Sequence, residues 1–251
     1  MPSTTPMSLL HMTIATPAFN EEITLEPIVR ACLDILDQPD IQGGEVLIVD
    51  DGSTDGTRAT AEKLVALHDN VRLHRHQKNR GFAAVQKSCY KQARCDWIFL
   101  LPADGQIAPS EINRFLPLCD QYDLMFGATG FAPERGLRGL QTGAYHALVE
   151  TLFKLRLGHF GSCVMVRREL VQSLRLSSRT PVLMTELAVR ARAARARIAT
   201  IPVDKKPRQH GAAKGGNMLR ISPNIAKDLT ALYLDAMIRK SIPRAAGEGG
   251  S

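Results

Sequence analysis

The feature that most constrains the fold of this chain is an alternation of two kinds of segment over its first 130 residues. Short apolar runs suited to buried strands are separated by longer stretches in which apolar residues recur every three or four positions, as on one face of a helix. This alternation is typical of βαβ units, whose parallel strands form one sheet between two layers of helices. The predicted strands are 12–16, 45–50, 71–75, 97–101 and 123–127. The predicted helices are 23–36, 57–67, 83–93 and 109–118.

The second half of the chain is patterned more loosely. It predicts a basic, glycine-containing loop at 204–217, strands over 163–166 and 198–203, and helices over 138–157, 184–196 and 222–239. No repeat or low-complexity block separates the halves, and 251 residues with 44% hydrophobic content suffice for one buried core. We therefore expect a single α/β domain over residues 1–244, followed by a disordered tail, 245–251.

Positive charge is concentrated in the last third of the chain. The whole chain carries a net charge of +7, whereas residues 186–244 hold thirteen lysines and arginines against four aspartates and glutamates, or +9. Such a segment suits nucleic acid, a phosphorylated ligand or an anionic membrane surface, and a merely solvated face explains it equally well. Aromatic residues make up 5% of the chain and form no stacking platform, which argues against a nucleic-acid partner.

Cysteine content and hydropathy are typical of a cytosolic protein. The five cysteines are odd in number and include no CxxC pair, so they indicate neither a disulfide framework nor a zinc site. No apolar run approaches the ~20 residues that span a bilayer. We expect a cytoplasmic protein. Its last amphipathic helix can pack within the domain or lie peripherally at the cytosolic membrane face, and we favour the membrane contact. The sequence leaves the oligomeric state open.

In an open α/β sheet, ligands bind beyond the carboxyl ends of the strands, so the turns after the strands carry the functional information. The first such turn, 16–22, contains no glycine, which argues against a GxGxxG dinucleotide cradle and a GxxxxGK[ST] phosphate loop. The second turn, 49–57, holds three carboxylates. Turn and helix-cap preferences explain Asp50 and Asp55. Asp51 is a candidate acceptor for the ring N–H of uracil or guanine.

The turn after the fourth predicted strand follows a strongly apolar run. It presents one acid, Asp104, and one amide, Gln106. Oxygen ligands suit a hard divalent cation, and Mg²⁺ in particular binds through one or two carboxylates plus substrate phosphates. The turn therefore predicts a site for Mg²⁺ or Mn²⁺ at Asp104 and Gln106. The alternative is a surface aspartate without function.

These turns, taken with two further motifs, resemble the family 2 glycosyltransferases of the GT-A fold, and among them polyprenyl-phosphate glycosyltransferases similar to dolichol-phosphate mannose synthase. The resemblance covers roughly residues 12–235. It implies a Rossmann-like, mostly parallel sheet with helices on both faces, in which 12–130 bind the nucleotide sugar and 131–244 form the acceptor side. The motifs are Pro17-Ala18-Phe19-Asn20-Glu21-Glu22, Val49-Asp50-Asp51-Gly52-Ser53-Thr54-Asp55-Gly56-Thr57, Asn79-Arg80-Gly81-Phe82, Ala103-Asp104-Gly105-Gln106 and Arg208-Gln209-His210-Gly211-Ala212-Ala213-Lys214.

The resemblance also implies roles for individual residues. Asp104 and Gln106 hold the cation and the diphosphate, and the loop with Arg208 and Lys214 closes over the phosphates. The acceptor phosphate is contacted by Arg138 and Thr142, which one helical turn places on one face. The full set implied for the nucleotide sugar is Pro17, Phe19, Glu21, Val49, Asp51, Ala103, Asp104, Gln106, Arg208 and Lys214.

Three places depart from the family pattern. Pro102 stands where the metal motif usually begins with an aspartate, so Asp104 is left to bind the cation as a single carboxylate. Thr129 replaces an arginine. Residues 158–162 keep neither key residue of an Asp-x-x-Ser-Gly element. These changes leave the sugar and the acceptor open.

The activity implied is an inverting transfer of a sugar from a UDP- or GDP-linked donor to a polyprenyl phosphate. A lipid monophosphate is largely ionised at neutral pH, so no strong base is required. Charge on the leaving diphosphate would be stabilised by a cation at Asp104 and by Arg208, while Arg138 binds the acceptor.

Two rival hypotheses remain. A soluble hydroxyl acceptor would require a base, for which Glu186 is the candidate, although a helix-surface charge explains it equally well. A less favoured hypothesis is a basic α/β domain that binds nucleic acid. His74 and His76, two positions apart in a predicted strand, are interpreted as one surface edge and not as a metal site.

Overall fold

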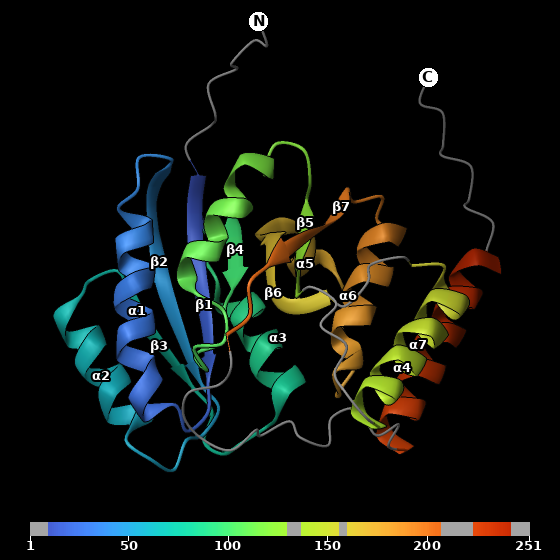
Figure 1. The fold of residues 1–251 in the computed structure, drawn as a ribbon, viewed down its shortest axis with the longest axis horizontal. Coiled ribbons are helices and arrows are strands. Elements are labelled where there is room, and N and C mark those ends of the chain that lie inside the picture. Colours follow the sequence, from blue (N-terminus) through green and yellow to red (C-terminus); the bar gives the residue numbers. More distant parts are fainter. Residues whose placement is uncertain (1–9, 130–136, 156–159, 207–222, 242–251) are drawn as a thin grey trace, which may run out of the picture.

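The apolar runs of the first half form parallel strands of one sheet. The computed structural model describes residues 10–129, 137–155, 160–206 and 223–241 (Figure 1). The first four strands are β1 (Leu10–Ala18), β2 (Ile41–Asp50), β3 (Val71–Arg75) and β4 (Trp97–Leu100). The sheet continues through β5 (Leu124–Thr129), β6 (Phe160–Arg167) and β7 (Ile198–Val203). The strand order is β3-β2-β1-β4-β6-β5-β7, and among the described strands only β6 runs antiparallel to its neighbours.

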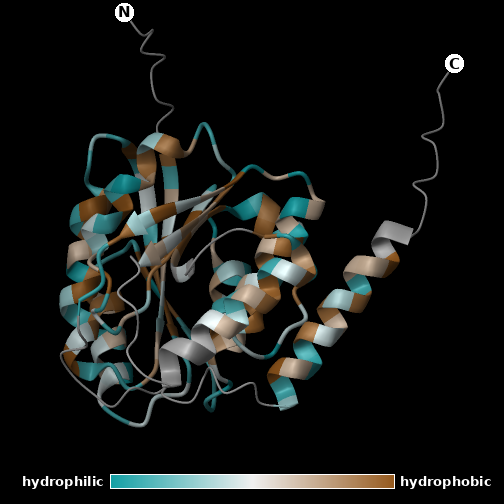
Figure 2. Ribbon diagram, turned by 45° about the vertical axis from the view of Figure 1, so that its right-hand side comes forward, coloured by the Kyte–Doolittle hydropathy of each residue, from teal (hydrophilic) through white to brown (hydrophobic). Residues whose placement is uncertain are grey.

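Two hydrophobic cores lie on the two faces of this sheet, because successive strand residues point to opposite faces. Met12 and Ile14 of β1 pack with α1 (Glu22–Leu36) and α2 (Thr57–Leu67). Ala15 of β1 and Leu47 of β2 belong to the other core. That core includes residues of α3 (Phe82–Gln92), α4 (Leu137–Phe153), α5 (Arg168–Ser173), α6 (Val182–Ala193) and α7 (Pro223–Ser241). In Figure 2, hydrophobic and hydrophilic residues alternate along the helices of both layers, as amphipathic helices require.

The structure confirms the order of the predicted strands and of the predicted helices, with three differences among the helical segments. The segment 109–118 is not an α-helix but two 3₁₀ turns, η1 (Pro109–Arg114) and η2 (Leu116–Leu118). Pro117 is the physical reason, because it donates no hydrogen bond and disfavours the α conformation of the residue before it. The short helix α5 was not predicted, and the helix predicted over 138–157 ends earlier, at Phe153.

No helix in the described part of the chain is both long and apolar enough to cross a membrane. The predicted tail, 245–251, and most of the predicted basic loop lie outside the described residues.

Candidate active site

The turns that follow β1 and β2 are joined at the carboxyl edge of the sheet, the lower edge in Figure 1. The Asn20 N–H donates to Ser53 Oγ over 2.9 Å, and the Thr54 N–H donates back to Asn20 Oδ1 over 2.8 Å. The Glu21 N–H donates to Thr57 Oγ1 over 2.7 Å. Asn20 has a φ of +53°, a conformation that asparagine tolerates better than most residues. These bonds hold the first motif against the second.

The residues expected to contact the nucleoside differ in whether their side chains are accessible to a ligand. Pro17 and Phe19 are half-buried, and Glu21 is buried with Oε2 accepting a bond from Thr24. Val49 and Ala103 have fully buried side chains, one in each hydrophobic core. At Val49 and Ala103, therefore, a ligand would contact the main chain and not the side chain.

Asp51 joins the second motif to the third. Its Oδ1 accepts the Arg80 N–H over 2.9 Å, and its Oδ2 accepts the Gly81 N–H over 2.8 Å. Oδ1 also lies 2.6 Å from His76 Nδ1. Asp51 thus positions the segment between β3 and α3.

Gly52 allows this segment to approach closely. Its φ is +72°, and a Cβ at this position would lie 2.5 Å from the carbonyl carbon of Lys78. Glycine is therefore required at position 52 by both conformation and space.

Asp50 has the turn role that its sequence position predicts. Its Oδ1 accepts the Ser53 N–H over 2.9 Å.

His76 corrects the interpretation of His74 and His76 as a surface edge. The His76 side chain is only 2% exposed, and its Nε2 lies 2.8 Å from Ser88 Oγ on α3. Sequence reasoning missed His76 and Ser88 because the local pattern around His76 carries no signal of a partner 25 residues upstream.

The turn with Asp104 lies directly beside the first turn. The Ala103 N–H donates to the Pro17 carbonyl over 3.1 Å, which continues the β1–β4 pairing to the edge of the sheet. The Gln106 N–H donates to Asp104 Oδ1 over 3.1 Å. Gly105 lies between them with a φ of +69°. The structure therefore brings together the three turns that the sequence singles out.

Asp104 and Gln106 fit a cation that a ligand helps to hold. The described residues contain no group of three or more His, Cys, Asp or Glu side chains that could bind a metal by themselves. One carboxylate and one amide oxygen, completed by phosphate oxygens, form a donor set that Mg²⁺ and Mn²⁺ accept. The donor set thus favours a cation that binds together with a diphosphate.

The residues that follow β7, where the predicted basic loop begins, are hydrogen-bonded to the turn that carries Asp104. The Lys206 N–H donates to the Gln106 carbonyl over 2.8 Å, and Lys205 pairs with Ile107 in an antiparallel bridge. Arg208 and Lys214 lie outside the described residues. The loop that carries them therefore starts from a backbone bonded to the predicted cation site.

On the acceptor side, Arg138 and Thr142 both belong to the first turns of α4. They are one helical turn apart, as the sequence predicts. Their side chains lie outside the described residues.

Glu186 is not the surface charge that one interpretation expected, because it is fully buried on α6. Its carboxylate accepts the N–H groups of Ser177 and Ser178 over 2.9 and 2.7 Å and Arg190 Nε over 2.7 Å. Burial raises the pKa of Glu186, whereas these hydrogen bonds lower it, and the net shift is downward. A general base needs an accessible lone pair and a pKa near the operating pH. The geometry therefore favours a structural role.

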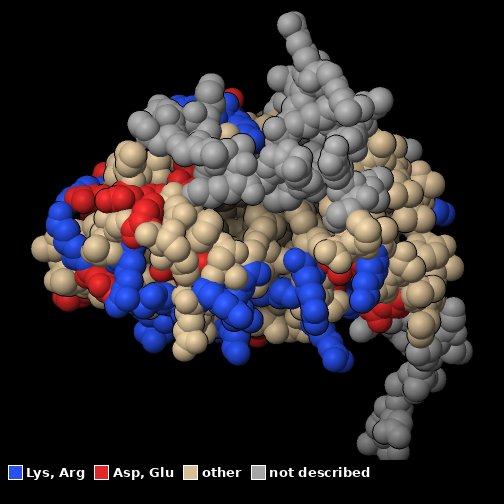
Figure 3. Space-filling view, turned by 90° about the horizontal axis from the view of Figure 1, so that it is seen from below, with Lys and Arg blue, Asp and Glu red and all other residues tan. Residues whose placement is uncertain are grey.

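Positive charge borders the carboxyl edge, which Figure 3 views directly, with a row of lysines and arginines along one side. Burial lowers the pKa of Lys87 on α3, whereas the carboxylates of Glu186 and Asp228 raise it, and the net shift is downward. The field of this row of cations attracts anions to the edge.

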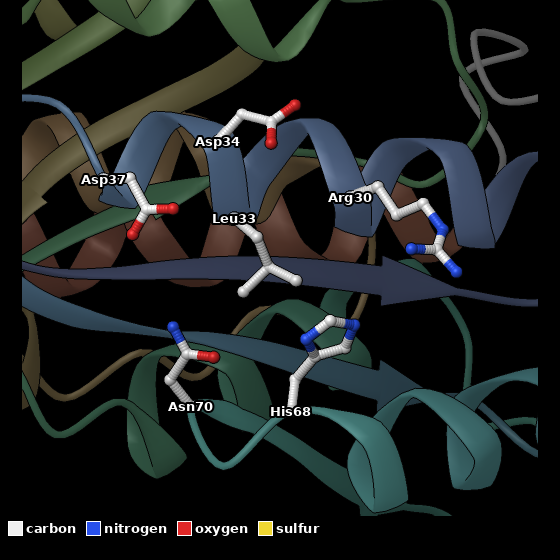
Figure 4. Close-up of a pocket in the computed structure, with 6 residues that line it drawn as sticks. All are labelled: Arg30, Leu33, Asp34, Asp37, His68 and Asn70. Atoms are coloured by element: carbon white, nitrogen blue, oxygen red, sulfur yellow. The ribbon is translucent and has the colours of Figure 1, made fainter.

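A cavity of about 450 Å³ lies at the opposite edge of the sheet (Figure 4). Asp34 points away from His68 and Asn70 in this view, so the polar groups do not converge. Parallel sheets bind ligands at the other end of their strands. The cavity is therefore not part of the candidate site. Its lining residues are Arg30, Leu33, Asp34, Asp37, His68 and Asn70.

Comparison of the chain with protein-family models identifies its family. The model described as Glycosyl transferase family 2 matches residues 13–175, more than half of the chain, and includes all three turns. The chain belongs to this family. Membership in a glycosyltransferase family favours the transferase hypotheses over a nucleic-acid-binding domain.

Several curated relatives of this family 2 chain are similar at about one quarter identity. Glycosyltransferase AglD of Haloferax volcanii is 26% identical over 79% of the chain and 34% of the relative. Dodecaprenyl-phosphate galacturonate synthase of Rhizobium johnstonii is 25% identical over 84% of the chain and 63% of the relative. Undecaprenyl-phosphate 4-deoxy-4-formamido-L-arabinose transferase of Pseudomonas fluorescens is 24% identical over 93% and 68%. The chain thus spans about one third to two thirds of these relatives.

Solved structures confirm the predicted GT-A fold. Glucosyl-3-phosphoglycerate synthase from Mycobacterium tuberculosis, in complex with Mn²⁺, UDP and phosphoglyceric acid, matches with a TM-score of 0.63 at 17% identity, over 89% of this chain and 78% of that one. A mannosyltransferase from Pyrobaculum calidifontis, in complex with GDP-Man and Mn²⁺, matches with a TM-score of 0.61 at 18% identity, over 96% and 67%.

Proposed function

We propose that this chain transfers a sugar from a UDP- or GDP-linked donor to a polyprenyl phosphate, with inversion at the anomeric carbon. The observation that carries the proposal is the meeting of the family motifs at one edge of the sheet, where hydrogen bonds donated by main-chain N–H groups hold them together. Relatives named for dodecaprenyl- and undecaprenyl-phosphate substrates align with 84% and 93% of the chain and support the acceptor class.

The donor site in this proposal follows the order of the turns. Pro17, Phe19, Glu21 and Asp51 surround the nucleoside, with main-chain contacts from the two buried positions described above. Asp104 and Gln106 would hold a divalent cation and the diphosphate. When bound, the cation would neutralise charge that develops on the leaving group.

The remaining cations complete the proposed donor site. Arg208 and Lys214 close over the phosphates from a loop that begins beside Gln106. Both residues add positive charge where the leaving group becomes more negative, which is the kind of preorganised electrostatic stabilisation that contributes most to many enzyme rates.

The proposed transfer is a single displacement. An oxygen of the acceptor phosphate attacks the anomeric carbon and forms the new C–O bond, while the bond to the donor diphosphate breaks and the nucleoside diphosphate leaves with the electron pair. Arg138 and Thr142 bind and orient the acceptor phosphate. Because that phosphate is already ionised at neutral pH, the step requires no base.

The chain would work as a peripheral protein at the cytosolic membrane face. The support is a stripe of exposed apolar residues on α7, namely Leu234, Met237 and Ile238. A lipid-linked acceptor requires the site and the membrane to be close, and an amphipathic helix lying at the interface satisfies this need.

The experiment is a transfer assay with purified protein, UDP- and GDP-linked sugars, Mn²⁺, and undecaprenyl phosphate in detergent. We expect a glycosyl phosphate lipid by mass spectrometry, and its loss with chelator and with Asp104→Asn. Asp96→Asn is the matched control, because Asp96 is an exposed aspartate before the same strand. Transfer only to soluble hydroxyl acceptors would overturn the acceptor class. Salt-sensitive binding of oligonucleotides without any effect of nucleotide sugars would overturn the function.

A further inference from the structure

A chain of hydrogen bonds links Asp51 to helix α3 through His76. His76 Nδ1 lies 2.6 Å from Asp51 Oδ1, and His76 Nε2 lies 2.8 Å from Ser88 Oγ. The side chains of His76 and Asp51 are 2% and 3% exposed, so these bonds lie in an environment of low dielectric constant. Buried polar networks of this kind fix the orientation of their members when every member is satisfied.

The donors around Asp51 determine where His76 carries its proton. Each Asp51 oxygen accepts a main-chain N–H, from Arg80 and from Gly81, as an ionised carboxylate does. Nδ1 of His76 must then be protonated, because an unprotonated Nδ1 would bring two lone pairs together at 2.6 Å. The Ser88 hydroxyl completes the network, since it can donate to an unprotonated Nε2 and accept from a protonated one.

The same donors leave one acceptor position of the Asp51 carboxylate unoccupied by the described residues. A carboxylate has about four such positions. Oδ1 accepts from His76 and Arg80, and Oδ2 accepts from Gly81. The second position of Oδ2 has no donor among the residues that the structure describes.

We propose that His76 and Ser88 are positioning residues, which fix the Asp51 carboxylate so that this position faces the ring N–H of the donor's nucleobase, N3–H of uracil or N1–H of guanine, already assigned to Asp51 in the proposed function. The inference rests on the proposed function. Cytosine N3 and adenine N1 carry lone pairs in place of this N–H, so a fixed carboxylate repels them. A hydrogen bond to a charged group corresponds to about a tenfold to hundredfold difference in affinity.

The experiment compares dissociation constants by calorimetry, with Mn²⁺ present, for UDP, GDP, CDP and N3-methyl-UDP. We expect the wild-type chain to bind UDP or GDP at least about tenfold more tightly than CDP. If UDP is the nucleotide bound, N3-methylation weakens it by a similar factor. His76→Leu abolishes this preference, and Ser88→Ala reduces it by several-fold.

Two further variants separate positioning from folding. His76→Asn retains most of the preference, because its amide N–H can replace Nδ1–H. His74→Leu, two residues earlier on β3, is the matched control and leaves the preference unchanged. The ratio of two affinities measured on one sample does not depend on the folded fraction. Ser88→Ala removes a single hydroxyl and keeps the test usable if His76→Leu does not fold.

The outcomes distinguish this inference from the function on which it rests. Wild-type protein that binds neither UDP nor GDP overturns both. A wild-type preference that persists unchanged in His76→Leu and Ser88→Ala overturns the positioning role and leaves the proposed function standing.

Discussion

Asp51 connects two motifs that are separate in the sequence, because its carboxylate accepts the main-chain N–H groups of Arg80 and Gly81. Gly52, the next residue, lets the backbone at Lys78 come near enough for those bonds. At the residue scale, the second motif is therefore a structural support for the third as well as a candidate ligand contact.

Gly52→Ala tests this support. The substitution places a side chain in a left-handed conformation and against the Lys78 backbone, so we expect a loss of about 3 kcal/mol in unfolding free energy. Gly43→Ala is the control, since Gly43 has a φ of +81° but nothing within 4 Å of the added Cβ. It should lose only about 1–2 kcal/mol. Urea denaturation measures both, and equal losses would show that the close approach is unimportant.

At the scale of elements, Glu186 fixes α6 to its neighbours. Its carboxylate accepts hydrogen bonds from Ser177 in the loop before α6 and from Arg190 on α6 itself. Arg190 also contacts Asp235 on α7 over 2.8 Å. This ion-pair chain joins α6 to α7.

Glu186→Gln should destabilise the protein by about 2–3 kcal/mol, because either orientation of the amide sets its NH₂ against a donor. Denaturation with urea measures the loss. Glu62→Gln, which removes an exposed ion pair with Arg58, should change little. Full stability of Glu186→Gln together with lost transfer to a hydroxyl acceptor would contradict the structural role and identify Glu186 as a base.

Asp123 ties β5 to β7 and gives this half of the sheet a pH dependence. Hydrogen bonds from the Arg197 guanidinium lower the pKa of Asp123 from 3.8 to about 2. A carboxylate whose pKa is lower in the folded state stabilises the fold above its ordinary pKa and loses that contribution as the pH falls. The difference in unfolding free energy between wild type and Asp123→Asn should therefore shrink from pH 5 toward pH 2. A difference that stays constant with pH would refute the assignment.

Elements could be predicted wherever the signal is local. Apolar runs and helical spacing lie within one segment, so the order of strands and helices was correct from the sequence. The α-helix predicted over 109–118 was wrong, because Pro117 interrupts the helix that the spacing of apolar residues indicates. The partners of His76 and Glu186 could not be predicted, since each bonds segments that only the folded sheet brings together. The meeting of the three turns followed from sheet topology alone.

At the scale of the whole molecule, α7 presents an exposed apolar stripe. Leu234, Met237 and Ile238 are 54%, 44% and 58% exposed and recur at the spacing of one helical face. The sequence continues with Arg239 and Lys240, whose charge suits anionic head groups.

Replacing Leu234 and Ile238 by aspartate should reduce sedimentation with phosphatidylglycerol vesicles several-fold, because the apolar contact is lost and negative charge is added. Leu67→Asp is the control, since Leu67 is 58% exposed on α2, in the layer on the other face of the sheet. Equal binding by the double variant and the wild type would exclude α7 as the membrane contact.

The most direct test of the account is a crystal structure of the chain with Mn²⁺ and whichever of UDP and GDP it binds. We predict the base beside Asp51, the diphosphate and the cation at Asp104 and Gln106, and the loop with Arg208 and Lys214 over the phosphates. A nucleotide bound in the cavity beside His68, or anywhere away from the carboxyl edge of the sheet, would contradict it.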